Sequence, residues 1–189
     1  MNVYDFDETV YRGECSLEFF LYYLRKDFSL IKYIPGVFRA LILYKQEKIS
    51  LDSFLTDYGK EVGKYMAAHS AELNSAVKSF WDKREKHINS FYFLQQREDD
   101  VIITASPDFL MEEICRRIGV KNLISTHIDP HTGKIEKPCF REAKIERFRE
   151  VYPTQKIDDF YTDSMNDRFL MPLAEHVFIV KGKRIKQVK

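Results

Sequence analysis

The stretch that decides the fold is Asn2-Val3-Tyr4-Asp5-Phe6-Asp7-Glu8-Thr9, at the start of a chain of 189 residues. Residues 2–6 are predicted to form a short buried strand, because a mainly apolar run leads directly into the acids. Residues i and i+2 of an extended strand point the same way. The carboxylates of Asp5 and Asp7 are therefore predicted to face one common site.

Polar residues also end strands that are predicted much further along the chain. The apolar run at 101–103 ends in Thr104, and the strand predicted at 157–162 is followed by Asp163. Open α/β sheets hold their ligand crevices beyond the carboxyl ends of parallel strands. We therefore expect Asp5, Thr104 and Asp163 to converge on one site.

The rest of the pattern alternates between strands and helices. Further strands are predicted at 123–126 and 176–180, and a helix at 142–151. Another helix is predicted to begin at Ser106-Pro107, with Ser106 as N-cap and the proline at the first helical position, and to end before Gly119. This alternation predicts an α/β fold, with a Rossmann-like, mostly parallel sheet flanked by helices.

The segment 16–95 has a helical period instead. It is predicted to contain helices at 17–25, with Ser16 as N-cap, at 51–58, with Ser50 as N-cap, and at 71–89. This segment is predicted to be an all-helical cap subdomain, inserted into an α/β core that comprises residues 1–15 and 96–189.

The residues at the strand ends are suited to phosphoryl transfer. Asp5 is the candidate nucleophile, and Asp7 is the candidate general acid and base. Lys144, on a predicted helix, would balance the negative charges of the nucleophile and the phosphate. Thr104 would donate its hydroxyl to a phosphate oxygen, and the helix that opens at Ser106 would direct backbone N–H groups to the same place.

In order and rough spacing, these residues resemble the motifs of the haloacid dehalogenase-like superfamily, in its phosphoserine-phosphatase-like branch. The matching positions are Asp5, Asp7 and Thr9 of a DxDxT motif, the strand-end Thr104, Lys144, and the acidic pair Asp163 and Asp167. The resemblance implies a phosphatase that hydrolyses a phosphate monoester through an aspartyl phosphate on Asp5, with Mg²⁺ as cofactor.

The resemblance also implies a metal site. The carboxylates of Asp5 and Asp163 and the backbone carbonyl of Asp7 would bind Mg²⁺, which prefers oxygen ligands. Asp167 lies one helical turn beyond Asp163, and its carboxylate could reach a metal-bound water or hold Lys144.

Substrate contacts are expected from Glu14, Thr9 and Ser106. In phosphoserine phosphatases the position of Glu14 binds the substrate amino group, although relatives with other substrates also carry an acid there. Thr9 is expected to stabilise the turn after the acids. The cap would select the leaving group.

Three alternatives concern single residues. Related hydrolases often carry a glycine between the cysteine and the lysine of the third motif, which residues 140–143 lack, so Lys137 is the alternative to Lys144. His127 and His131 have a spacing that could hold zinc, but a surface turn at 129–133 is the preferred interpretation. An EF-hand is excluded, because Val10 stands where that loop needs glycine.

Composition excludes some classes of function. The net charge of +1 indicates no strong attraction to nucleic acid or to an anionic membrane, although contact with a membrane surface stays a minor alternative. The cysteines at 15, 115 and 139 show no C-x-x-C spacing, which argues against a zinc ribbon and a disulfide framework. No signal peptide or membrane span is predicted, so the expected compartment is the cytoplasm.

The expected partner is a small-molecule phosphate ester. Aromatic residues are frequent in the first part of the cap, namely Phe19, Phe20, Tyr22, Tyr23, Phe28, Tyr33, Phe38 and Tyr44, and most are expected to be helix packing. Arg39, Lys45 and Lys48 could meet a second anionic group. The alternative functions are a phosphotransferase, a phosphatase of lipid-linked phosphates, or a non-catalytic binding module. The basic tail at 181–189 is predicted to be an edge strand.

Overall fold

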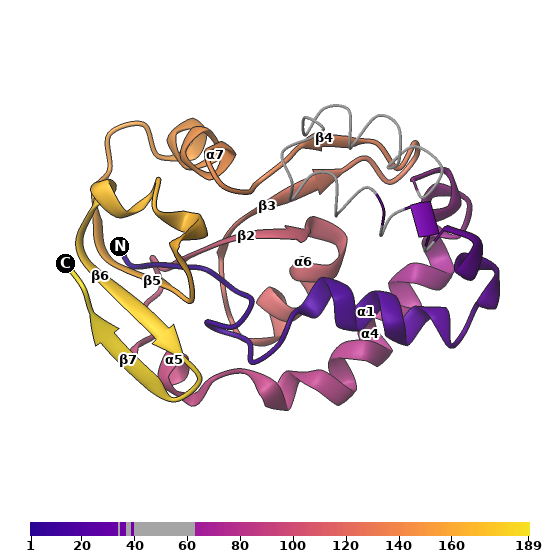
Figure 1. Ribbon diagram of the computed structural model, residues 1–189, viewed down its shortest axis with the longest axis horizontal. Coiled ribbons are helices and arrows are strands. Elements are labelled where there is room, and N and C mark those ends of the chain that lie inside the picture. The colour runs from indigo at the N-terminus through magenta and orange to yellow at the C-terminus, as the bar shows by residue number, and fades with distance from the viewer. Residues whose placement is uncertain (34, 37–38, 40–62) are drawn as a thin grey trace.

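The computed structural model describes residues 1–33, 35–36, 39 and 63–189 (Figure 1). Its described part contains a seven-stranded sheet in the order β4-β3-β2-β1-β5-β6-β7. The strands are β1 (Val3–Tyr4), β2 (Val101–Pro107), β3 (Asn122–Ile128), β4 (Ile135–Lys137), β5 (Ile157–Thr162), β6 (Ala174–Lys181) and β7 (Arg184–Gln187). The five inner strands pair in parallel, and β4 and β7 add antiparallel edges. The predicted α/β class is confirmed, and so is the basic edge strand, whose residues are all exposed.

The helices lie on both faces of this sheet. They are α1 (Cys15–Leu24), α4 (Ser70–Arg84), α5 (Ser90–Gln95), α6 (Asp108–Arg117) and α7 (Ala143–Val151), with 3-10 turns η1 (Phe28–Tyr33), η2 (Glu85–His87), η3 (Met165–Asp167) and η4 (Met171–Leu173). In the described part of the chain, no helix has both the length and the apolar character that crossing a membrane requires.

The alternation of side chains along the strands divides the core in two. Val3 and Ile103 belong to a cluster with Phe148 of α7. Tyr4 and Ile102 belong to a second cluster, built with α1, α4, α5 and α6. Figure 1 accordingly shows α7 well apart from α1, α4 and α6. Both faces of the central strands are buried, which is typical of parallel sheets and explains their continuous apolar runs.

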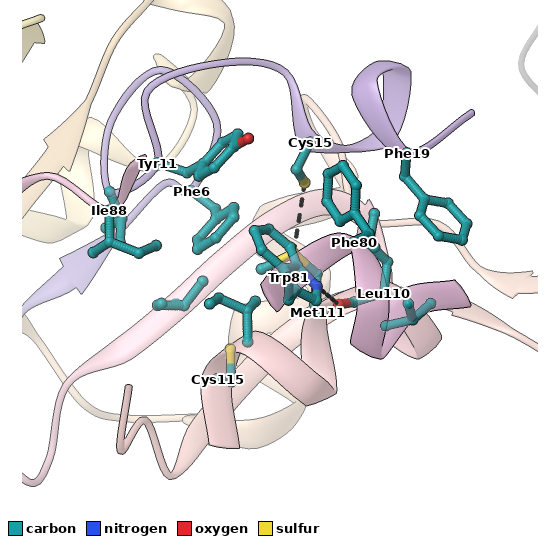
Figure 2. Close-up of a cluster of buried hydrophobic side chains, with 14 of the residues drawn as sticks. Phe6, Tyr11, Cys15, Phe19, Phe80, Trp81, Ile88, Leu110, Met111 and Cys115 are labelled. Atoms are coloured by element: carbon teal, nitrogen blue, oxygen red, sulfur yellow. Dashed lines mark hydrogen bonds between the residues drawn. The ribbon is translucent and has the colours of Figure 1, made fainter. Parts of the chain in front are cut away.

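The helical segment is joined to the sheet by a tryptophan. Trp81 of α4 is fully buried, and its Nε1–H donates to the backbone oxygen of Leu110 in α6 at 2.8 Å. Its ring makes edge contacts with Phe6, at 6.1 Å between centroids, and with Tyr11, at 5.4 Å. Figure 2 shows these side chains around the start of α6, together with Cys15. Helix α4 therefore packs against the residues that follow β1.

Two helix starts differ from the prediction. Helix α1 begins at Cys15 with Glu14 as N-cap, and α6 begins at Asp108 with Pro107 as N-cap, so neither Ser16 nor Ser106 has the predicted role. The cause for α6 is that β2 extends to Pro107, which pairs with Thr126. The helix predicted at 71–89 ends at Arg84 and continues as η2.

The other local signals are confirmed where the structure describes them. Gly119 has a φ of +75°, and the N–H of Val120 donates to the oxygen of Cys115 at 2.8 Å, which closes α6 in a Schellman-type end. The turn at 129–133 joins β3 to β4. The helix predicted at 51–58 lies outside the described residues, as do Phe38, Tyr44, Lys45 and Lys48.

Candidate active site

Asp5 lies where β1 ends. Its backbone N–H donates to the oxygen of Tyr161 at 2.8 Å, so the pairing with β5 continues one residue beyond the strand. The next side chain, Phe6, points into the core and stacks on Tyr11 with 5.8 Å between ring centroids. Strand β1 ends at Tyr4 and Phe6 already lies in a turn, but the charge of Asp7 acts on Asp5, so the two carboxylates lie near one another.

A tight turn follows these acids. Glu8 has a φ of +54°, a left-handed conformation that is uncommon outside glycine, and Gly13 has a φ of +140°. The N–H of Glu8 donates to the oxygen of Gly13 at 3.1 Å, and that of Tyr11 donates to Phe6 at 2.8 Å. Thr9 is fully buried, and its hydroxyl has no hydrogen-bond partner within the described ranges. The turn is thus held by backbone hydrogen bonds.

Lys144 reaches the acids from the first turn of α7. Its Nζ lies 2.8 Å from Asp5 Oδ1 and 2.7 Å from Asp167 Oδ1, and all three residues are buried. Thr162, the last residue of β5, donates its hydroxyl to Asp167 Oδ2 at 3.0 Å. Of the two roles open to Asp167, the structure therefore shows the second, which is to hold Lys144.

Lys137, the alternative to Lys144, lies elsewhere. Its side chain is exposed on β4, and its Nζ lies 3.8 Å from Oε2 of Glu150, its ion-pair partner. The replacement of the expected glycine by residues 140–143 is accommodated by Arg141, which has a φ of +47°. The positive φ gives the chain a sharp turn two residues before α7 begins. Helix α7 then packs on one face of the sheet through Phe148, and Lys144 in its first turn reaches Asp5.

Asp7 is held by hydrogen bonds from two sides. Its Oδ1 accepts the backbone N–H of Cys15 at 2.7 Å, and its Oδ2 accepts the hydroxyl of Ser106 at 2.8 Å. The Ser106 oxygen is in turn 2.7 Å from the hydroxyl oxygen of Ser16. In the ionised form of Asp7, which only accepts, Ser106 donates to Asp7 and Ser16 donates to Ser106.

Thr104 lies beside this chain of hydroxyls. It is buried in β2, and its Oγ1 accepts the backbone N–H of Ser106 at 3.1 Å. The N–H of Phe109 donates to the Asp108 side chain at 2.9 Å, and Pro107 has no N–H. The start of α6 therefore offers fewer N–H groups to an anion than the sequence predicts.

Asp163 directly follows β5 and is partly buried. Its Oδ2 lies 3.9 Å from Lys181 Nζ, a side chain that is 68% exposed, so this pair is weak. Glu14 is exposed at the N-cap of α1, directly before Cys15, whose N–H donates to Asp7. His127 Nδ1 is within 2.5 Å of Asp108, while His131 is exposed in the turn, so these two histidines do not form a site together.

Burial sets the electrostatics of the site. Burial raises the pKa of Asp5; the charge of Lys144 opposes this shift and the charge of Asp167 adds to it. Burial also raises the pKa of Asp7, against its hydrogen bonds from Cys15 and Ser106. For Lys144, burial acts to lower the pKa, but the carboxylates of Asp5 and Asp167 overcome it and raise the pKa, so the ammonium stays protonated.

The donor set suits a hard divalent cation. Asp5 and Asp167 share the ammonium of Lys144, whose charge also acts on Asp7, and Lys144 is the buried cation among the described residues that pairs with these carboxylates. Within the described ranges, no group of three or more His, Cys, Asp or Glu side chains has the geometry of a metal site.

Three groups that contribute to the site were missed in the sequence. The Cys15 N–H contacts Asp7, and the Ser16 hydroxyl contacts Ser106. From the sequence, Ser16 is expected only to cap a helix. Thr162, which positions Asp167, reads as a strand residue. In the sequence these residues are marked only by lying next to motif residues. That position does not tell which way their side chains point.

Carboxylates at the carboxyl edge of a parallel sheet, with a buried lysine between two of them, form the candidate active site of an α/β enzyme. The haloacid dehalogenase-like hydrolase family matches residues 3–172, and the chain belongs to that family. No curated protein matches the sequence.

Solved structures share the fold. A protein of unknown function from Bordetella pertussis Tohama I has a TM-score of 0.71 and 20% identity, over 91% of this chain and 85% of that one. A phosphoserine phosphohydrolase-like protein from Francisella tularensis SCHU S4 has a TM-score of 0.56 and 14% identity, over 94% and 86%. Cytosolic 5'-nucleotidase IIIB, bound to cytidine, has a TM-score of 0.57 and 13% identity, over 95% and 71%. At these identities the likeness establishes the fold.

Proposed function

We propose that this protein is a Mg²⁺-dependent phosphatase that hydrolyses a small phosphate monoester through an aspartyl phosphate on Asp5. The observation that carries the proposal is the 2.8 Å pairing of Lys144 with Asp5 at the carboxyl edge of the sheet. A buried ammonium beside a buried carboxylate allows that carboxylate to meet an anionic substrate, which would otherwise be repelled. The family and the phosphatases that share the fold agree with this chemistry.

The reaction would take place in two displacements. An Asp5 carboxylate oxygen forms a bond to phosphorus while the ester oxygen–phosphorus bond breaks, and Asp7 gives its proton to the departing alcohol. Asp7, now ionised, then takes a proton from a water molecule, whose oxygen bonds to phosphorus as the bond to Asp5 breaks. Inorganic phosphate leaves, and both aspartates return to their starting states.

The neighbouring side chains prepare these steps. Lys144 neutralises charge as the phosphoryl oxygens approach Asp5. The Thr104 oxygen is already an acceptor for the Ser106 N–H, so its own proton is directed elsewhere and can be donated to a phosphoryl oxygen. The hydrogen bonds from Cys15 and Ser106 orient the Asp7 carboxyl toward the leaving group. Ser106 then acts on the substrate by holding this carboxyl, and Thr9 contributes to the turn through its backbone N–H, which donates to the oxygen of Phe6 at 3.2 Å.

Mg²⁺ fits the excess of oxygen ligands. Asp5, Asp163 and the backbone carbonyl of Asp7 would hold it, and when bound it would polarise the phosphoryl oxygens and add positive charge. Asp5 and Asp167 share the single ammonium of Lys144, and this excess of negative charge supports a cation in addition to the lysine.

Residues 16–95 are proposed to act as the cap. The described part of this segment is helical and packs on the turn after Asp7 through Trp81. The three cysteines are free and buried, which agrees with the proposed cytoplasmic location.

A phosphatase assay tests the proposal. The purified protein, assayed with a panel of phosphate monoesters, should release phosphate with added Mg²⁺ and lose this activity with excess EDTA. Asp5→Asn should release none under the same conditions. Equal phosphate release with and without the chelator would rule out the metal, and inactivity on the whole panel would favour a binding module.

A further inference from the structure

A cavity of about 150 Å³ lies between the helical segment and the start of α6. Its walls come from α1, α4, the start of α6 and the end of β3, and include Phe19, Leu73, Phe109 and Leu110. Ser16 and Pro107 line its inner end. Two of these wall residues, Phe19 and Leu110, are labelled in Figure 2, where they lie on the same side of Phe80.

The inner end of the cavity adjoins the proposed proton donor. Ser16, which lines the cavity, is 2.7 Å from Ser106, and Ser106 donates to Asp7 at 2.8 Å. The oxygen of the leaving group would take its proton from Asp7. Two hydrogen-bonded side chains, Ser106 and Ser16, connect Asp7 to the cavity. The cavity is placed to receive the carbon skeleton of that leaving group.

The walls are almost entirely apolar. None of the described residues that line the cavity carries a charge, and the polar ones are Ser16, Tyr23 and Tyr65. Ser16 and Tyr65 are already engaged, the first with Ser106 and the second with Asp27. A charged amino acid group placed here would lose its hydration without gaining a charged partner, which is costly.

We propose that the preferred substrate is a phosphate monoester whose leaving alcohol carries an aromatic ring or a short alkyl chain, which occupies this cavity. This inference rests on the proposed phosphatase function and narrows its substrate class. A dry apolar cavity of about 150 Å³ has room for a benzene-sized group. Glu14, exposed at the start of α1, would then meet only a part of the substrate that lies outside the cavity.

A homologous series of n-alkyl phosphates tests the inference, because alcohols from ethanol to hexanol are alike as leaving groups. Each methylene that enters the cavity should raise kcat/KM by about fourfold, and the gain should level off at about six carbons. Benzyl phosphate should exceed ethyl phosphate, and phosphoserine should be among the poorest substrates. A kcat/KM that does not depend on chain length would overturn the inference while leaving the phosphatase function intact.

A variant pair ties the effect to the cavity. Leu73→Trp, which fills the cavity from α4, should lower the ratio of kcat/KM for hexyl over ethyl phosphate by about tenfold or more. Leu21→Phe is the matched control, because Leu21 lies on α1 and is 48% exposed. It should leave the ratio unchanged. An unchanged ratio in a folded Leu73→Trp protein would show that the chain binds elsewhere.

A binding measurement separates this inference from the proposed catalysis. Calorimetry should show that hexylphosphonate, which cannot be hydrolysed at its carbon–phosphorus bond, binds tens of times more tightly than ethylphosphonate. This difference should persist even if no ester is turned over, which would refute the phosphatase function alone. Equal affinities, or no binding of either phosphonate, would overturn the cavity as a subsite.

Discussion

Lys144 and Asp5 lie 139 residues apart in the chain, and their side chains meet at 2.8 Å in the buried site. Lys144 also holds Asp167 at 2.7 Å, so one ammonium ties α7 to the residue after β1 and to η3. The pair thus links the stability of the fold to the charge of the proposed nucleophile.

Replacing Lys144 should affect both properties. Lys144→Ala leaves two buried carboxylates without their cation, a change that typically costs about 3–5 kcal/mol of unfolding free energy. Affinity for inorganic phosphate, measured by competitive inhibition, should fall far more than in Lys137→Ala, the control on exposed β4. Denaturant titration checks the stability. The reverse ranking of the two lysines would show that the third motif was misplaced.

Asp5→Asn should abolish turnover while preserving the fold. An amide cannot form the acyl phosphate, and Lys144 keeps Asp167 as its partner. Phosphate release should fall below detection, with a melting curve close to that of the parent protein. Asp99→Asn is the control, since Asp99 is 61% exposed and pairs with the N-terminus at the far end of β1. Measurable turnover by Asp5→Asn would exclude the covalent mechanism.

Asp7→Asn should be impaired in a way that depends on the substrate. Loss of a general acid lowers the rate by about 10²–10⁴-fold when the leaving oxygen needs a proton. A nitrophenolate leaves readily without one, so kcat on p-nitrophenyl phosphate should fall much less than kcat on ethyl phosphate. Comparing the two substrates in one variant is the measurement. A uniform loss would indicate that Asp7 acts mainly through the metal.

Ser106→Ala should weaken turnover without eliminating it. Asp7 loses one hydrogen bond but keeps the N–H of Cys15, so kcat on an alkyl phosphate should fall by about tenfold, near the low end for a hydrogen bond to a charged group. Ser75→Ala, on the exposed face of α4, should have no effect on kcat. If Ser106→Ala kept the parental kcat, the hydroxyl would have no role in positioning Asp7.

Metal binding should be visible without any assay of activity. Mg²⁺ bound only by the folded protein raises its melting temperature, by about 2–4 °C for each kcal/mol of binding free energy in a chain of this size. Asp163→Asn should remove most of this shift, and Asp99→Asn should retain it. Calorimetric melts with Mg²⁺ and with EDTA provide the comparison. An unchanged shift in Asp163→Asn would remove that residue from the ligand set.

The sheet and the main acids could be predicted because their signals are local. A strand such as Val101–Ile103, buried on both faces, reads as a continuous apolar run, and the polar residue that follows it marks the carboxyl edge. Lys144 could be preferred over Lys137 because it lies on a helix that can pack beside the sheet. These inferences require only periodicity and order along the chain.

The hydroxyl chain beside Asp7 could not be predicted, because it depends on contacts between distant segments. Ser106 has the local sequence of a helix cap, but β2 extends past it by pairing with β3, which frees its hydroxyl for Asp7. The Ser16 hydroxyl likewise contacts that of Ser106, a residue 90 positions away in the sequence. The cavity has the same origin, since its walls come from elements that are far apart in the chain, among them α1, α4, α6 and β3.

Trp81 makes the junction between the helical segment and the site observable in solution. It is the only tryptophan in the chain, so fluorescence excited at wavelengths that only tryptophan absorbs comes from Trp81 alone. Buried and hydrogen-bonded to Leu110, it contacts the rings of Phe6 and Tyr11, which flank Asp7. Its emission should be blue-shifted in the native protein. Any movement of α4 that accompanies substrate entry would change that emission, with no label attached.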